Sequence, residues 1–308
     1  TTAAGGALAA VVRAVDEVSV ELDIPGIASA HIAELHVEQD SAWLTERLRE
    51  HLRLLSLADA RTPWRESWAA GALSLAAAGE LESPPTLPVP ELAAIDAMND
   101  EQRAALDSVM TRPVTVVLGP PGTGKTRTLA GGVAAIAAAG HSVLVVAPSN
   151  AAVDVVLAQI TEALADHPQI GFGLVQRFGP NVSAHLTPEL ARTVVPAHIL
   201  ARLREQAAEL GETLRAWAAE ARLQGNSAEA EAHECFAAEL DREAQGFPGL
   251  LERNRLVTVA PIAQLYLNPS LWTRYTFLAI DECTQACPAA VAVIAGMAED
   301  RLLLAGDC

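Results

Sequence analysis

One eight-residue segment, Gly119-Pro120-Pro121-Gly122-Thr123-Gly124-Lys125-Thr126, constrains the fold of this 308-residue chain more than any other feature. It fits the pattern G-x-x-x-x-G-K-[S/T] and lies between an apolar run at 114–118 and an alanine-rich segment at 126–139 that suits a helix. In a strand–turn–helix unit of this kind, backbone N–H groups converge on phosphate oxygens at the positive end of the helix. The segment therefore predicts a phosphate-binding loop between a strand and its crossover helix.

The residues of this loop have predicted parts in holding a nucleotide. Lys125 is the only lysine among 21 basic residues, which indicates a position that needs a compact ammonium group. We expect its ammonium to reach the β- and γ-phosphates of ATP, and the Thr126 hydroxyl to ligate Mg²⁺. The predicted nucleotide-binding residues of the loop and helix start are Gly119, Pro120, Pro121, Gly122, Thr123, Gly124, Lys125, Thr126 and Arg127.

The second half of such a site needs acidic residues at the end of a neighbouring strand. The apolar run at 276–280 leads directly into Asp281 and Glu282. We expect Asp281 to hold Mg²⁺ through its water shell, and Glu282 to orient and deprotonate the water that attacks the γ-phosphate. An apolar strand that ends in Asp-Glu, in a chain that already contains a phosphate-binding loop, predicts a site for ATP hydrolysis.

Short apolar runs separated by helical connections predict a buried, mostly parallel sheet, and hence an α/β fold. One polar, helical segment at about 181–255 interrupts this pattern and predicts a helical hairpin that projects from the sheet, with a break at Gly225-Asn226. Its expected seam has heptad spacing, which is typical of helix pairs. The predicted strands are at 114–118, 142–147, 174–178, 256–260, 276–280 and 301–305, and the expected seam residues are Leu200, Leu203, Ala207, Leu210, Leu214, Trp217 and Ala221.

The chain before this sheet has a different character. Residues 1–82 form a mixed region of unknown role, with a strand expected at 18–24 and an amphipathic helix at 41–57. Four prolines in residues 83–90 predict an extended linker and a domain boundary. The third predicted domain is an ATP-binding lobe at 91–308.

Charge and composition restrict the environment of the chain. The sequence is 51% apolar and carries a net charge of −17, which argues against binding nucleic acid by charge alone. No apolar run is long enough to span a bilayer, so no membrane partner is expected. The N-terminus has no secretory pattern, and the four cysteines have no metal-type spacing. These features favour a cytoplasmic protein with reduced thiols.

Together the motifs resemble the first RecA-like lobe of superfamily 1 helicases, in the subgroup of the nonsense-mediated-decay helicase and senataxin. Residues 99–105 are similar to the Q motif of that family, 147–154 (APSNAAVD) to its motif Ia, and 281–285 (DECTQ) to its motif II, with Cys283 in place of alanine. Residues 302–307 are similar to the start of motif III, and the sequence ends inside that motif at Cys308. The resemblance implies a RecA-like P-loop NTPase lobe with an inserted hairpin.

The resemblance also implies further site residues. Gln102 is expected to read adenine, and Gln285 to couple the γ-phosphate to the nucleic-acid side. Ser149 and Asn150 are expected to contact the backbone of single-stranded DNA or RNA, and Thr258 is a candidate phosphate contact. The implied function is an ATP-dependent helicase or translocase motor that uses ATP and Mg²⁺.

Two alternatives remain open from the sequence: another P-loop ATPase, such as a ring-forming machine, or a nucleotide-gated nucleic-acid-binding module. The helicase lobe needs a second RecA-like lobe, and no part of residues 1–308 resembles one. We therefore expect this polypeptide alone to be nearly inactive.

Overall fold

The computed structural model describes residues 11–15, 20–23, 45–46, 48–50, 84–180 and 185–307, in two compact units, Thr1–Thr45 and Glu46–Cys308. In the first unit, β1 (Val11–Val15) pairs antiparallel with β2 (Val20–Asp23). The strand expected at 18–24 is thus present as β2, and β1 is an addition. Residues 45–46 and 48–50 of the helix expected at 41–57 are helical, and its other residues lie outside the described part.

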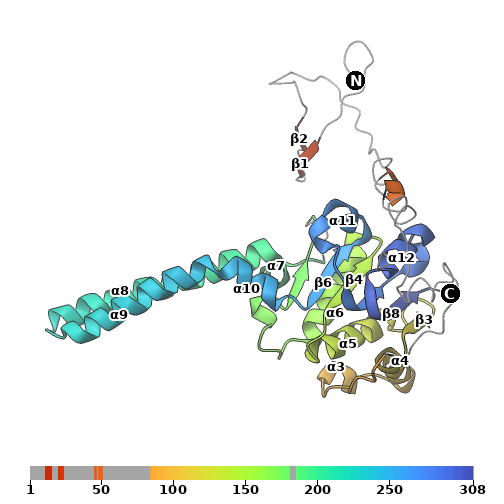
Figure 1. The fold of residues 1–308 in the computed structure, drawn as a ribbon, viewed down its shortest axis with the longest axis horizontal. Helices are drawn as coiled ribbons and strands as arrows, with labels where there is room; N and C mark the ends of the chain where they lie inside the picture. Colours follow the sequence, from red (N-terminus) through yellow and green to blue (C-terminus); the bar gives the residue numbers. More distant parts are fainter. Residues whose placement is uncertain are drawn as a thin grey trace, which may run out of the picture. The chain divides into compact units, whose positions relative to one another are not determined.

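The second unit is built on a parallel sheet whose strand order is β3-β8-β7-β4-β6-β5. All six predicted runs form strands of this sheet, which confirms the α/β class and the RecA-like lobe (Figure 1). Because every strand is parallel, the carboxyl ends of all six lie on the same side of the sheet, which we call its carboxyl edge. The strands are β3 (Val114–Leu118), β4 (Val143–Ala147), β5 (Val175–Arg177), β6 (Val257–Pro261), β7 (Tyr275–Ile280) and β8 (Ala298–Gly306).

Helices pack against this sheet and form the main core with it. The predicted crossover helix is α5 (Lys125–Ala138), which is buried from Thr128 to Ala137 and packs beside α6 (Asn150–Ala163). Their alanine and valine side chains belong to the same buried cluster as apolar residues of β4 and β7, which forms the main core. The smaller helices are α3 (Ala93–Asp96), α4 (Asp100–Thr111), α7 (Pro188–Val194), α10 (Phe247–Asn254), α11 (Ile262–Leu267) and α12 (Pro288–Ala295).

The strand that leads into the phosphate-binding loop lies at the edge of the sheet rather than in its centre. Val116 and Leu118 of β3 are 55% and 57% exposed, whereas β4 and β6 are buried along their whole length. The expectation of a sheet buried throughout is therefore wrong for β3. An apolar run of five residues predicts a strand, but it does not reveal whether that strand will be paired with another strand on both of its sides.

The inserted hairpin consists of α8 (Pro196–Leu223) and α9 (Ser227–Gln245), which pack along each other and project from the sheet (Figure 1). Gly225 joins them with a φ of +79°, and the side chain of Asn226 caps α9. The predicted break is thus confirmed. A left-handed residue at this point favours glycine, because it has no Cβ to clash with the backbone.

The seam of this hairpin matches the predicted one only in part: Leu203, Ala207 and Ala221 of the expected residues are buried. Leu210 and Trp217 are 49% and 50% exposed, while Gly211 and Ala218 are buried. Ala230 and Ala237 of α9 are buried too. Small side chains let two helices approach closely, so they occupy the contact and displace the larger residues to its side. Heptad spacing alone does not specify which of two adjacent positions faces the partner helix.

The proline-rich segment is attached to the lobe. The described residues 84–92 have no regular secondary structure, in agreement with an extended segment. The backbone N–H of Leu87 donates to the Met110 carbonyl over 3.2 Å, and the buried guanidinium of Arg301 donates to the Pro85 carbonyl. In the described part of the chain, no helix has the length and apolar character that crossing a membrane requires.

Candidate nucleotide site

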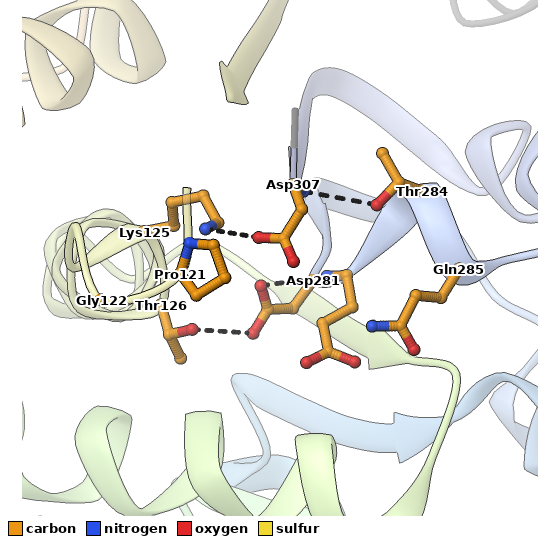
Figure 2. A pocket seen from close by; sticks show the side chains of 10 residues that line it. Pro121, Gly122, Lys125, Thr126, Asp281, Thr284, Gln285 and Asp307 are labelled. Carbon is orange, nitrogen blue, oxygen red and sulfur yellow. Dashed lines mark hydrogen bonds and ion pairs between the residues drawn. The ribbon is translucent and has the colours of Figure 1, made fainter. Parts of the chain in front are cut away.

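The ends of three strands bring the predicted nucleotide residues together. β3 ends at the phosphate-binding loop, β7 ends at Asp281, and β8, which lies between them, ends at Asp307. Figure 2 shows the resulting pocket, with the loop and the two acidic strand ends facing one another. The residues that line it are Pro121, Gly122, Lys125, Thr126, Asp281, Glu282, Thr284, Gln285, Gly306 and Asp307.

The loop has the backbone geometry that a phosphate cradle requires. Gly122 and Gly124 have φ angles of +85° and +83°, and Gly124 is the cap from which α5 begins. A side chain at either position would be strained, since L residues rarely adopt this conformation. The Thr123 hydroxyl donates to the Pro120 carbonyl over 2.9 Å and closes the turn. The first turn of the 14-residue helix α5 thus faces the pocket with free backbone N–H groups.

Lys125 is held inside the pocket by three oxygen atoms. Its ammonium lies 2.7 Å from Oδ1 of Asp307, and it donates to the carbonyls of Gly119 at 2.7 Å and Pro120 at 3.1 Å. Sequence reasoning placed Asp307 in motif III but did not assign it to the site. The available signal was an acidic residue directly after a predicted strand, as at Asp281; what was missing was that β8 lies next to β3.

The two predicted metal ligands, Thr126 and Asp281, contact each other. The Thr126 hydroxyl donates to Oδ2 of Asp281 over 3.2 Å, so residues 155 positions apart meet through their oxygens. Burial raises the pKa of Asp281, and hydrogen bonds from the Glu282 backbone and from Thr126 oppose this effect. A hydroxyl and one carboxylate are hard oxygen donors that suit Mg²⁺, which takes few ligands from the protein and the rest from phosphate and water. The residues present therefore fit the ion.

Glu282 has an unusual backbone. Its φ of 49° makes it the one non-glycine residue with a positive φ in the described part of the chain. Such strain costs of order 1–3 kcal/mol and is typical of functional positions. Burial, followed by the charges of Asp281 and Asp307, raises the pKa of Glu282. A carboxyl group with a raised pKa at the end of a strand suits a proton acceptor.

The segment after Glu282 connects β7 to the end of β8. Gln285 lines the pocket, and the backbone N–H of Asp307 donates to the Thr284 hydroxyl over 3.3 Å. A Cβ on Gly306 would lie 2.9 Å from Thr284 Cγ2 and 3.0 Å from Cys283 Sγ, so only glycine fits this contact. Motifs II and III of the sequence are thus packed directly on each other.

The structure also places the two remaining predicted nucleotide residues. Gln102, on α4, forms a capping box with Asn99 and donates to the Thr123 carbonyl over 3.3 Å, so its amide lies against the phosphate-binding loop. Gln102 is therefore not a free surface residue, and its position suits contact with a nucleotide base. Arg127 is exposed on α5 and is not among the residues that line the pocket.

The predicted nucleic-acid residues lie at the end of β4, apart from Thr258. Ser149 is exposed and caps α6 by accepting from the backbone N–H of Ala152. The Asn150 side chain accepts a hydrogen bond from Arg177, at 3.1 Å from Nη2. Thr258 is fully buried inside β6, at 0% exposure, so the structure does not bring it to the surface with Ser149 and Asn150. Its threonine hydroxyl faces the protein interior, a feature that a strand-end motif does not reveal.

Comparison with known proteins agrees with this geometry. A family model described as AAA domain matches residues 97–308. The chain is 50% identical over 58 residues to "Regulator of nonsense transcripts 1 homolog" of Arabidopsis thaliana, covering 18% of this chain and 5% of that protein. It is 31% identical over 103 residues to "DNA replication ATP-dependent helicase/nuclease DNA2" of Bos taurus, covering 32% and 9%.

A third relative extends the match. The chain is 30% identical over 117 residues to "Uncharacterized ATP-dependent helicase MJ0104" of Methanocaldococcus jannaschii, covering 37% of this chain and 18% of that protein. The matched regions thus span less than a fifth of each of these relatives. These similarities confirm the resemblance to superfamily 1 helicases that the motifs predicted.

Proposed function

Because the chain belongs to the AAA domain family, we propose that it is the ATP-binding motor lobe of an ATP-dependent helicase or translocase. The observation that carries this proposal is the convergence of Lys125, Thr126, Asp281 and Glu282 in one pocket at the carboxyl edge of a parallel sheet. Ligands of open α/β sheets bind at this edge. Two of the relatives are named ATP-dependent helicases, and for this reason we assign the ATP-driven activity to a helicase or translocase.

The predicted nucleotide residues have separate parts in this function. The N–H groups of the loop and the ammonium of Lys125 bind the β- and γ-phosphates, and Gln102 contacts the adenine. Thr126 and Asp281 hold Mg²⁺, which neutralises charge on the phosphate oxygens when it is bound. Glu282 orients a water molecule toward the γ-phosphorus and accepts its proton, for which a raised pKa is suited.

The partner in this proposal is single-stranded DNA or RNA. Ser149 and Asn150 present a hydroxyl and an amide beyond the end of β4, and neutral groups of this kind bind phosphate and sugar without a basic patch. This mode of contact is compatible with the net charge of −17. Gln285, which lines the pocket and is the last residue of the segment at 283–285, is the proposed link from the γ-phosphate to the strand.

The proposal is tested by titrating the chain with fluorescent ADP and ATP in the presence of Mg²⁺. We expect Lys125→Ala to abolish binding, because it removes the only cation among the residues that line the described pocket. Glu282→Gln should keep nucleotide affinity and lose hydrolysis. Arg127→Ala is the matched control, because this neighbouring cation is exposed outside the pocket, and it should bind nearly as the wild type does. Equal affinity of wild type and Lys125→Ala would contradict the proposal.

A further inference from the structure

A fully buried ion pair lies beside the proposed nucleic-acid residues. Arg177, at the end of β5, and Asp154, on α6, both have side chains with 0% exposure. Nε of Arg177 lies 2.8 Å from Oδ1 of Asp154, and Nη2 lies 3.4 Å from Oδ2. Removing two charges from water is expensive, and a buried pair often stabilises a fold no better than apolar residues of the same size do. Stability alone therefore gives a weak reason for this pair.

The guanidinium has two further bonds, and these connect the pair to the surface. Nη1 donates to the Gly179 carbonyl over 2.7 Å, and Nη2 donates to Oδ1 of Asn150 over 3.1 Å. The charged group of Arg177 thus contacts Asn150, the half-buried first residue of α6, which follows the exposed cap Ser149. Two segments distant in sequence, at 150–154 and 177–179, are joined by one side chain.

This contact determines which way the Asn150 amide points. A guanidinium carries only donors, so the group that faces it has to be the amide oxygen and not the NH₂ group. The oxygen is turned toward Arg177, so within the amide plane the NH₂ group points in a different direction, away from the guanidinium. Asp154 fixes Arg177 through Nε and Nη2, which prevents the guanidinium from turning away.

We propose that Arg177 and Asp154 are positioning residues that fix the Asn150 amide so that it offers N–H donors to a phosphate oxygen of a single strand. The proposal rests on the proposed function. Phosphate oxygens only accept hydrogen bonds, so the orientation of the amide decides between attraction and repulsion. A neutral donor at this position also allows strand binding by a chain with a net charge of −17.

The first experiment replaces the proposed donor by an acceptor of the same shape. Asn150→Asp keeps an oxygen facing Arg177 and places a second, anionic oxygen where the NH₂ group was. We expect this variant to fold normally and to bind a labelled oligo(dT) or oligo(U) at least roughly tenfold more weakly, with unchanged affinity for fluorescent ADP. Strand affinity equal to that of the wild type would overturn the proposal.

The second experiment removes the positioning pair as a unit. Arg177→Met alone would leave Asp154 buried without a partner, so it is combined with Asp154→Leu, which gives an apolar pair. We expect a folded protein with unchanged ADP affinity and a severalfold loss of strand affinity. In this background Asn150→Ala should cost less than it does in the wild type, because the two changes remove the same interaction. Losses that simply add would show that the pair does not act through Asn150.

The outcomes separate this inference from the function on which it rests. A wild-type chain that binds ADP but no single strand would overturn both the proposed function and the role of Asn150. Normal strand binding that survives Asn150→Asp and the paired substitution would overturn the positioning role alone. Thermal unfolding of each variant shows whether a loss of strand binding comes from loss of the fold.

Discussion

At the scale of single residues, the contact between Lys125 and Asp307 determines whether the Lys125 ammonium is available to a phosphate group. The Asp307 carboxylate lies 2.7 Å from the Lys125 ammonium, at the place where the loop is built to receive phosphate. A phosphate group that binds there has to compete with this carboxylate for the ammonium. Asp307 therefore acts against nucleotide binding in this conformation, whereas Asp281 and Glu282 are the residues proposed to hold the metal ion and the water.

We predict that Asp307→Asn tightens binding of fluorescent ADP. Asp307 is half exposed, so the pair is worth only about 0.5–1 kcal/mol, and the gain should be roughly twofold to fivefold. The increase should shrink at high salt, since the charge it removes is screened by solvent ions. Asp300→Asn, on the same strand but without a contact to Lys125, is the control and should change nothing. Weaker ADP binding by Asp307→Asn would mean that the carboxylate assists the nucleotide instead.

The raised pKa of Asp281 gives a prediction about stability. Burial lifts this pKa above its ordinary value of 3.8. At a pH between the unfolded and the folded value, the folded chain therefore retains a proton that the unfolded chain has released. The fold is then most favoured, with respect to this group, below the unfolded value, and it loses stability as the pH rises through the folded value. We expect Asp281→Asn to raise the free energy of unfolding at pH 7 and to have no such effect near pH 3.5.

Urea titrations without nucleotide or Mg²⁺, at a series of pH values, measure this difference. Asparagine keeps an oxygen for the Glu282 backbone N–H and an amide group for the Thr126 hydroxyl, so the contacts of the site persist. Asp107→Asn serves as the control, because this residue is exposed on α4. If Asp281→Asn is less stable than the wild type at pH 7, the carboxylate stabilises the fold and our argument is wrong.

At the scale of elements, the hairpin of α8 and α9 is held by small residues. Gly211, Ala218 and Ala221 of α8 are buried against α9, where Ala230 and Ala237 are buried in turn. Close approach of two helices leaves no room for a longer side chain between them. The larger apolar residues Trp217 and Phe236 remain on the outside, at 50% and 59% exposure.

We predict that Ala218→Leu destabilises the hairpin by about 1–3 kcal/mol, because it overfills this contact. Ala219→Leu is a matched control: it is the same substitution one residue further along α8, at an exposed position, and should have little effect. Thermal unfolding followed by circular dichroism measures both. Similar effects of the two substitutions would show that the seam does not run through Ala218.

At the scale of the whole molecule, the charges in the pocket bear on the rate of hydrolysis that we expect. Among the residues that line the described pocket, Lys125 is the one cation, and three carboxylates face it. In phosphoryl transfer, a positioned arginine typically contributes 10³–10⁵ in rate, and no arginine lines this pocket. The residues here can bind the nucleotide and hold a water molecule, but they leave the charge of the transition state largely uncompensated.

We predict that the polypeptide of residues 1–308 binds ATP, hydrolyses it slowly and does not unwind a duplex. Phosphate release, measured with and without oligo(dT) or oligo(U), checks this expectation. Rapid, strand-stimulated turnover that is lost in Glu282→Gln would contradict it. A rate that rises with the square of the protein concentration would show that a second copy completes the site.

Local sequence determined the parts of this protein whose geometry depends on neighbouring residues in the chain. Gly122 and Gly124 take positive φ angles that favour glycine, and short apolar runs between helical segments favour strands, so the phosphate-binding loop and all six strands were predictable. Asp281 and Glu282 were predictable for the same reason, because they directly follow a strand. The break at Gly225 depends on one residue and its φ angle, and it too was visible in the sequence.

Only the tertiary structure decided which distant residues meet. Asp307 reaches Lys125 because β8 lies beside β3, and the order of strands in a sheet is not encoded in any one strand. Arg177, Asp154 and Asn150 join β5 to α6 across a sequence gap of more than 20 residues. The seam of the hairpin contains Ala218 in place of the expected Trp217, because the packing of two helices depends on the shapes of both. Burial is a property of the assembled molecule, and for this reason the same residue type is exposed on β3 and enclosed on β4.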